Sequence, residues 1–383
     1  MLPQGFEGVV TAKWIFPVSG PALENGAIRV RAGRVVDVAR AGLLPVDFDL
    51  GPMAIVPGLV NSHAHIDLSI LAGKTPPQPD FLAWLSSLIA YRLTSEPPTR
   101  EAIHAAAIEA MAGMVGTVLI GDIDSGDDAL ADRIAERMEV VSFFEIRGRT
   151  ALQEADSRNR LAGFRDRPRR HPREIRGLAP HAPYSTRPSL YRLAAEEGLP
   201  VAIHLAETRE EVQLTETRTG PFVPFIDRLG GFVPENVGGT IREILDGLSR
   251  VPRLLVVHGN YLDPEIEVPG NATVVYCPRT HAAFEHDPHP FRRFLERGIP
   301  VALGTDSLAS NPDLNVWNEA VFLRKHYPAL PASTLLEMMT IRGAQALCRE
   351  TDHGTIEPGK SARFHFVSWT DDSKDLFAQP RAV

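Results

Sequence analysis

Cysteine is scarce in this chain, which has only Cys277 and Cys348 among its 383 residues. Two cysteines so far apart exclude a disulfide framework and a cluster of thiolate metal ligands. The chain also lacks an apolar run of roughly 18 residues, which a membrane-spanning helix needs, and a basic segment followed by an apolar one at its start. Because 48 acidic residues outnumber 40 Lys and Arg, we expect a cytoplasmic protein that binds neither nucleic acid nor membrane.

Histidine, by contrast, is plentiful, with 13 residues. A chain with many imidazoles and few thiols builds metal sites from nitrogen and carboxylate ligands. Apolar residues make up 44% and charged residues 23% of the chain, which is ordinary for a globular protein. The length predicts two to three domains, or one large α/β barrel with an appendage.

Short apolar runs alternate with helical patterns through the middle of the chain. They cover residues 54–62, 116–122, 139–146, 175–180, 200–205, 253–259, 272–277 and 299–306. This alternation predicts parallel strands joined by crossover helices, and eight of them over about 250 residues is the size of a (β/α)₈ TIM barrel. A doubly wound open sheet is the alternative, but no glycine-rich phosphate-binding fingerprint supports it.

Both ends of the chain show short β runs separated by turn residues. We therefore predict a small β-sandwich domain made of residues 1–53 and 354–383, with residues 54–353 forming the barrel; loose edge strands at the two termini are the alternative. Two long connections, residues 67–99 and 206–252, leave the carboxyl ends of barrel strands. They are candidates for the walls or lids of an active site.

Metal-ligating side chains stand at the ends of several predicted strands. His63 and His65 are two residues apart, so a strand directs both imidazoles to one face. His204, His258 and Asp306 each end or directly follow another apolar run. Active sites of such barrels lie at the carboxyl ends of the strands, where these side chains converge. Imidazoles with one carboxylate suit Zn²⁺ or Fe²⁺ and leave a position open for water.

The motifs VPGLVNSHAHIDLS, HAPYS, HLAETREE, HGNYL, GTDSLASN and GTIEPGKSA resemble, in this order, the amidohydrolase superfamily. The likeness is to its branch of nucleobase and nucleoside deaminases and chlorohydrolases, and it covers nearly the whole chain. It implies that His63, His65, His204 and Asp306 hold one divalent metal ion. Zn²⁺ is the first choice and Fe²⁺ the alternative, since the ligand set suits both.

The resemblance also implies the catalytic groups. Glu207 would shuttle protons, His258 and Asp306 would assist the attacking water, and His181 would contact the substrate ring. The chemistry agrees, because a metal ion makes hydroxide available near neutral pH and Glu207 follows His204 by only three residues. The strand-four motif LAPHAPY has no lysine, whereas binuclear members of the superfamily bridge two metals with a modified lysine there. This difference favours a single metal and deamination or dehalogenation.

Glu207 has an alternative explanation. It can be an ordinary glutamate in the first turn of the next helix, where the helix dipole stabilises it. Glu210 and Glu211 lie close by in the sequence and are equally placed for that role.

Three arginines are candidates for binding an anionic group of the substrate. Arg147 and Arg149 follow the third strand and Arg279 the seventh, and a guanidinium grips carboxylate or phosphate with two hydrogen bonds. Salt bridges to Glu145 or to acidic loop residues are the alternative. Trp84, in the first long connection, is a candidate for stacking on a purine ring, or it belongs to the core.

The segments CPRTHAAFEH and ALGTDSLASNPDLNVWNE resemble the aminodeoxyfutalosine deaminases, which implies 6-aminodeoxyfutalosine as substrate and a step in menaquinone biosynthesis by the futalosine route. Deamination of S-adenosylhomocysteine or methylthioadenosine, deamination of guanine, and triazine dechlorination stay open. So do a barrel that keeps the metal without turnover, a scaffold with surface histidines, and a homodimer. The family's usual Ala-Asp pair near the C-terminus is Ala362-Arg363 here, in the small β domain.

Overall fold

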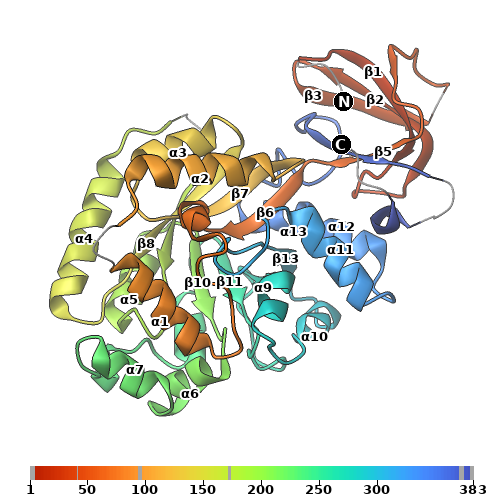
Figure 1. Cartoon of the computed structure of the whole chain (residues 1–383). Coiled ribbons are helices and arrows are strands. Elements are labelled where there is room, and N and C mark those ends of the chain that lie inside the picture. Colours follow the sequence, from red (N-terminus) through yellow and green to blue (C-terminus); the bar gives the residue numbers. More distant parts are fainter. Residues whose placement is uncertain (1–4, 41, 94–96, 171–173, 371–374, 380–383) are drawn as a thin grey trace.

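A computed structural model describes residues 5–40, 42–93, 97–170, 174–370 and 375–379. It consists of a barrel surrounded by helices and a smaller sheet beside it, to which both ends of the chain contribute (Figure 1). The parts of the predicted terminal domain in residues 1–4, 371–374 and 380–383 lie outside the described residues. Among the described helices, none is long and apolar enough to cross a membrane.

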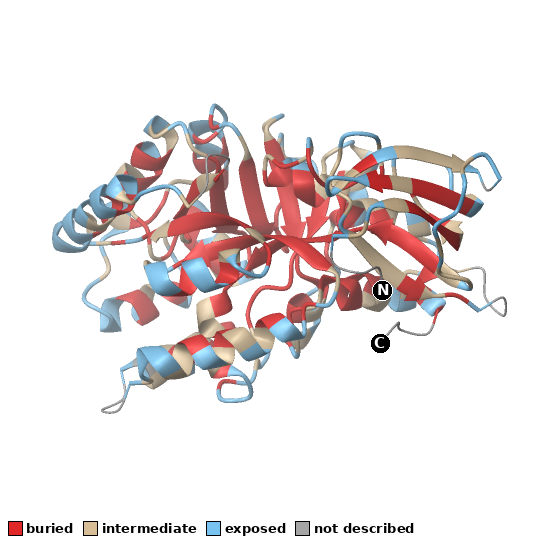
Figure 2. Cartoon of the chain, turned by 90° about the horizontal axis from the view of Figure 1, so that it is seen from above, coloured by how far each residue is buried: buried red, intermediate tan, exposed pale blue. Residues whose placement is uncertain are grey.

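Eight parallel strands form the barrel, in the order in which they follow along the chain. They are β6(Leu59–Ala64), β7(Thr117–Asp124), β8(Glu139–Ile146), β9(Arg176–Pro180), β10(Val201–Leu205), β11(Leu254–His258), β12(Ala272–Tyr276) and β13(Val301–Leu303). A parallel bridge between Ala64 and Asp306 closes the ring. The strands are buried almost throughout (Figure 2), which is why they read as continuous apolar runs. The predicted (β/α)₈ barrel is confirmed.

Helices cover the outside of the barrel, with buried faces toward the strands and exposed faces outward (Figure 2). The helical segments are η1(Ile66–Leu71), α1(Phe81–Arg92), α2(Arg100–Ala112), α3(Asp128–Ala135), α4(Ala151–Asp166), α5(Pro188–Glu196), α6(Arg209–Thr217), α7(Phe222–Arg228), η2(Pro234–Asn236), α8(Ile241–Gly247), α9(Pro278–Ala283), α10(Phe291–Glu296), α11(Val316–His326), α12(Ala332–Met338), α13(Ile341–Ala346) and η3(Leu376–Ala378). Local sequence sets several of their ends: Thr150 and Gln153 form a capping box at the start of α4, which satisfies amide groups that a helix start leaves free.

The small domain is one six-stranded sheet. Its strands are β1(Gly8–Ile15), β2(Leu23–Arg31), β3(Arg34–Arg40), β4(Phe48–Asp49), β5(Met53–Pro57) and β14(Phe364–Ser368). They run in the order β14-β5-β1-β2-β3, with β4 paired to β1. Ala32 and Gly33, both with positive φ, join β2 to β3, as a two-residue hairpin turn requires. The prediction that both termini build a small β domain is confirmed, but its described strands join in one branched sheet instead of the two separate sheets of the predicted β-sandwich.

One apolar run divides differently from the prediction. Residues 54–62, expected to form a single barrel strand, belong to β5 in the small sheet and β6 in the barrel. Gly58 lies between them, and a Cβ atom there would lie 2.6 Å from both Cγ atoms of Val118. Only glycine fits where the chain passes from one sheet into the other. β5 therefore spans the predicted domain boundary between residues 53 and 54 and stays in the small sheet as far as Pro57.

Candidate active site

The two histidines of the first barrel strand lie at the closure of the ring. His63 and His65 stand at the carboxyl end of β6 and are 1% and 8% exposed. The carbonyl oxygen of His63 accepts hydrogen bonds from the amides of Thr305 (3.0 Å) and Asp306 (3.1 Å). Barrel closure therefore brings the β6 histidines, from the start of the chain, beside an aspartate that follows the last strand.

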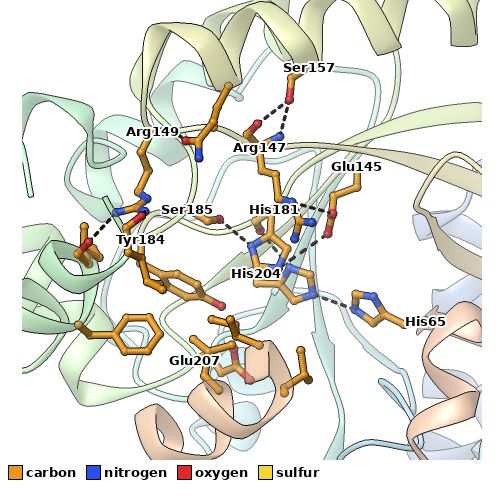
Figure 3. A pocket seen from close by; sticks show the side chains of 18 of the residues that line it. His65, Glu145, Arg147, Arg149, Ser157, His181, Tyr184, Ser185, His204 and Glu207 are labelled. Carbon is orange, nitrogen blue, oxygen red and sulfur yellow. Dashed lines mark hydrogen bonds and ion pairs between the residues drawn. The ribbon is translucent and has the colours of Figure 1, made fainter. Parts of the chain in front are cut away.

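Four of the predicted side chains meet there. The Nε2 atoms of His65 and His204 are 3.2 Å apart, and Asp306 Oδ1 lies 3.6 Å from His65 Nε2 and 3.7 Å from His63 Nε2. Figure 3 shows His65 and His204 facing each other across this point. Two imidazole nitrogens so close together need either a shared proton or a shared ion between them.

Hydrogen bonds outside the cluster fix which atoms face it. His204 Nδ1 lies 3.0 Å from the carbonyl oxygen of His181, and because a carbonyl only accepts, Nδ1 carries the proton and Nε2 keeps its lone pair. Ser310 Oγ donates to Asp306 Oδ2 at 2.7 Å, which leaves Oδ1 toward the histidines. Such outer partners are the usual support of metal ligands.

The electrostatics fit a bound cation. Burial lowers the pKa of His63, His65 and His204, so all three are neutral and present lone pairs. His63 Nε2 is buried and has no hydrogen-bond partner among the described residues, a cost that a metal ion would remove. The donor set of three neutral imidazoles and a carboxylate suits one divalent ion. The assignment of these four residues as ligands stays a prediction.

Glu207 and His258 lie beside the four donors. His258 Nε2 is 3.4 Å from Glu207 Oε1, and the two residues are 3% and 6% exposed, respectively. Burial, with Asp306 and Glu211 nearby, raises the pKa of Glu207 well above its ordinary value. A raised pKa moves a carboxyl group toward the range in which it can both accept and release a proton, which general acid–base chemistry requires.

The backbone is strained at these strand ends. Ala206, His258 and Asp306 have φ values of 54°, 68° and 58°, in the left-handed region that residues other than glycine seldom adopt. In each case the chain turns sharply out of a strand. Strain of this kind costs roughly 1–3 kcal/mol per residue and gathers at functional sites.

A cavity of about 670 Å³ opens over the cluster. Its apolar wall comes from the two long connections, which the sequence predicts as substrate walls: α1 contributes Phe81, Trp84, Leu85, Leu88 and Ile89, and α7 and its end contribute Phe225, Ile226 and Leu229. The segment from β8 into α4 forms the opposite, polar wall. The cavity thus combines an apolar surface, a polar surface and a floor of histidine and aspartate side chains, as small-molecule sites do.

The three candidate arginines have different surroundings. Arg147 lines the cavity with its side chain 47% exposed, and its Nε is 3.5 Å from Glu145 Oε2. Arg149 also lines the cavity, but its guanidinium donates to the carbonyl oxygens of Ile226 (3.2 Å) and Leu229 (3.0 Å) at the end of α7 (Figure 3). Arg149 therefore fastens the apolar wall, and Arg147 is the better placed of the two for a substrate anion.

Arg279 is not where the sequence suggests. It does not line the cavity. Its guanidinium instead donates to Asp313 Oδ1 (2.7 Å) and Glu319 Oε1 (2.7 Å), both behind the end of the seventh strand. Arg279 thus forms salt bridges with Asp313, in the loop before α11, and with Glu319, in α11, and it is not proposed as a substrate group.

The two ring candidates do line the cavity. Trp84 is 7% exposed, donates from Nε1 to Thr75 O at 2.9 Å, and packs against Phe284, so it belongs to the core and to the wall at once. His181 lies beside His204, with Nδ1 2.7 Å from Ser185 Oγ and Nε2 3.8 Å from Glu145 Oε1 (Figure 3).

With the site described, comparison with known proteins identifies the family. A model of the amidohydrolase family matches residues 54–379. The chain belongs to the amidohydrolase family. Together with relatives that are named deaminases, this membership supports a metal-dependent hydrolase that acts on C–N bonds.

Relatives and solved structures of amidohydrolases resemble the chain over most of its length. The 5-methylthioadenosine/S-adenosylhomocysteine deaminase of Moorella thermoacetica is 30% identical over 375 residues, covering 91% of this chain and 82% of its own. Aminofutalosine deaminase from Helicobacter pylori has a TM-score of 0.84 at 21% identity, covering 98% and 97% of the two chains. A zinc-bound adenosine deaminase from Xanthomonas campestris has a TM-score of 0.77 at 22% identity, covering 98% and 87%. These two structures show the shared fold.

This amidohydrolase also brings residues to the cavity that sequence reasoning did not select. Glu145 lies between Arg147 and His181, and the ring of Tyr184 lines the cavity while it stacks on Phe222. Tyr184 belongs to the motif HAPYS, and Glu145 is the last residue but one of β8. Their nearness to strand ends is the signal that selects them.

Proposed function

We propose that this amidohydrolase removes the amino group from the adenine ring of a nucleoside by hydrolysis. The observation that carries the proposal is the Glu207–His258 pair, 3.4 Å apart, set beside four converging donors on the floor of the cavity. The name shared by the sequence relatives, a deaminase of two adenine-containing compounds, supports the same chemistry.

His63, His65, His204 and Asp306 would hold the metal, which we expect to be Zn²⁺, with Fe²⁺ as the alternative. When bound, the ion lowers the pKa of water to near neutrality. The side chains supply the remaining work: Glu207 takes a proton from the water and passes it to a ring nitrogen, and His258 orients the water and stabilises the oxyanion. The water oxygen bonds to the ring carbon, the C–N bond breaks, and ammonia leaves with a further proton.

The first choice of substrate is 6-aminodeoxyfutalosine, which joins an adenine to a benzoate. Arg147 offers the exposed guanidinium that a carboxylate seeks, and the apolar wall of α1 and α7 offers a surface for an aromatic ring. His181 would contact the adenine. This assignment places the reaction in menaquinone biosynthesis by the futalosine route.

A second choice rests on a different observation. The relatives that match at 30% identity carry the name 5-methylthioadenosine/S-adenosylhomocysteine deaminase. S-adenosylhomocysteine also has a carboxylate for Arg147, whereas methylthioadenosine has none. The carboxylate of 6-aminodeoxyfutalosine belongs to an aromatic ring, whereas that of S-adenosylhomocysteine belongs to an amino acid.

The test is a panel of adenine nucleosides with the metal-loaded enzyme, followed by ammonia release and loss of adenine absorbance. We expect 6-aminodeoxyfutalosine to give the highest kcat/KM. Deamination of S-adenosylhomocysteine with 6-aminodeoxyfutalosine left intact would overturn the substrate choice. Conversion of no adenine compound, with about one metal bound per chain, would overturn the proposal of an adenine substrate and favour guanine deamination, triazine dechlorination or a barrel that binds its ligand without turnover.

A further inference from the structure

Glu211 is a buried carboxylate one helical turn beyond Glu207. It belongs to α6, whose first turn is capped by Thr208 Oγ1 accepting from the Glu211 amide at 3.1 Å. Its side chain is turned inward and is 1% exposed. Burying an ionisable group costs free energy unless hydrogen bonds compensate. The hydrogen-bond partners of this carboxylate therefore indicate its role.

Both carboxylate oxygens of Glu211 accept from the backbone beside the catalytic group. The Ala206 amide donates to Oε1 at 2.8 Å, and the Glu207 amide donates to Oε2 at 3.1 Å. Ala206 has a φ of 54°, which costs free energy for a residue other than glycine. The two hydrogen bonds hold the chain in this turn.

The carbonyl groups of the same two residues are also held. Tyr261 donates its amide to Ala206 O at 2.9 Å, and Asn260 Nδ2 donates to Glu207 O at 2.9 Å. Both donors follow His258, the partner of the Glu207 side chain. All four backbone polar groups of Ala206 and Glu207 are thus fixed between α6 and the turn after β11.

We propose that Glu211 is a positioning residue, which fixes the backbone of Glu207 so that its carboxylate lies where the proton must be transferred. Its neighbour Glu210 does not share this role, because it is partly exposed and accepts no such bonds in the described chain. The inference rests on the proposed function, because Glu211 affects catalysis only if Glu207 is the proton shuttle. A displacement of 1 Å at a reacting group costs on the order of a hundredfold in rate.

Glu211→Gln tests this role with little change in shape. The glutamine side chain keeps one oxygen, which can accept from one of the two backbone amides. Its NH₂ group faces the other amide, and because both groups are donors, that hydrogen bond is lost. We expect kcat on the best substrate of the panel to fall about tenfold to a hundredfold, while KM and metal content stay close to wild type. Hydrogen exchange of the peptide that holds Ala206 and Glu207 should become faster.

Glu174→Gln is the matched control. Glu174 is also buried, at 5% exposure, and accepts a backbone amide, from Arg170 at 2.8 Å, but it lies before the amino end of β9, away from the site. We expect it to lower the midpoint of thermal unfolding and leave kcat unchanged. A loss of kcat in Glu211→Gln no larger than in this control, or unchanged exchange at Ala206 and Glu207, would overturn the positioning role.

A double variant separates this inference from the proposed function. If Glu211 acts through Glu207, then adding Glu211→Gln to Glu207→Gln lowers kcat no further, whereas independent effects would multiply. Wild-type turnover by Glu207→Gln would refute the proton shuttle itself. An inactive Glu207→Gln together with a fully active Glu211→Gln would refute only the positioning role. If no compound on the panel is converted, the exchange measurement still decides whether Glu211 holds these amides.

Discussion

At the scale of single residues, the site depends on the direction in which each donor atom faces. His204 donates a hydrogen bond from one ring nitrogen to His181 O, and its other nitrogen faces the cluster. Asp306 accepts a hydrogen bond from Ser310 Oγ with one carboxylate oxygen, and its other oxygen faces the cluster. The outer bonds are as much a part of a metal site as the donors, because a misdirected lone pair contributes nothing to affinity.

Ser310→Ala should therefore weaken metal binding. The substitution removes the 2.7 Å hydrogen bond to Asp306 Oδ2 and lets the carboxylate rotate. Loss of such an outer partner typically lowers metal affinity 10- to 100-fold, and we expect about tenfold, measured by competition with a chelator. The exposed Ser249→Ala is the control. Equal affinities in the two variants would show that Ser310 does not orient the carboxylate.

Arg147→Ala should change substrate preference. Arg147 is the cavity arginine whose side chain is half exposed, and a hydrogen bond between charged groups is worth about 1.5–3 kcal/mol. We expect kcat/KM for a carboxylate-bearing nucleoside to fall roughly tenfold to a hundredfold, and that for methylthioadenosine to stay unchanged. A parallel loss with methylthioadenosine would mean that the arginine supports the cavity rather than the substrate anion.

A partly buried histidine makes stability depend on pH. Burial lowers the pKa of His365, beside Trp317, to about 4, against about 6.5 in an unfolded chain. Between these values the unfolded state binds a proton that the native state does not, so stability falls as the pH falls. His365→Phe should show a shallower loss of unfolding free energy in urea between about pH 6.5 and 4. A slope equal to that of wild type would refute this assignment.

At the scale of elements, the site requires β13 and β6 to approach closely. Gly304 follows β13, and a Cβ atom there would lie 2.9 Å from Val275 Cγ1 and 3.0 Å from His63 Cβ. Side chains of any size would push the strand that carries two of the predicted ligands. The glycine is thus a condition for the predicted metal site as well as for the barrel.

Gly304→Ala should lower both the thermal midpoint and the metal content of the purified protein. The control is Gly163→Ala in α4, where an added Cβ meets nothing within 4 Å. Because alanine favours a helix over glycine, the control should stabilise the protein by about 0.5–1 kcal/mol. Metal content unchanged in Gly304→Ala would show that the strands adjust without moving His63.

At the scale of the whole molecule, the sequence predicts the strands that are buried on both faces, because their pattern is visible within a few residues. All eight barrel strands were predicted, because strands covered on both faces become unbroken apolar runs. The division of residues 54–62 into β5 and β6 was missed for the same reason, since two consecutive buried strands give one run. The only local sign was Gly58, whose importance comes from contact with Val118 and Arg363.

Long-range contacts account for the remaining differences. Arg279 was expected at the cavity, but its partners Asp313 and Glu319 lie 34 and 40 residues away in the sequence, and spacing does not show such pairs. Glu211 was indistinguishable from Glu210 until the fold turned one inward. The five residues that converge from four strand ends were predictable, because the barrel places all carboxyl ends on one face.

The turnover of Glu207→Gln, purified with its metal, tests the proposed mechanism most directly. We predict about one divalent ion per chain, as in wild type, and a kcat lower by about a hundredfold to ten-thousandfold on the best adenine nucleoside. Metal content serves as the check that the fold and the four donors are intact. Wild-type turnover in the metal-loaded variant would contradict the central claim.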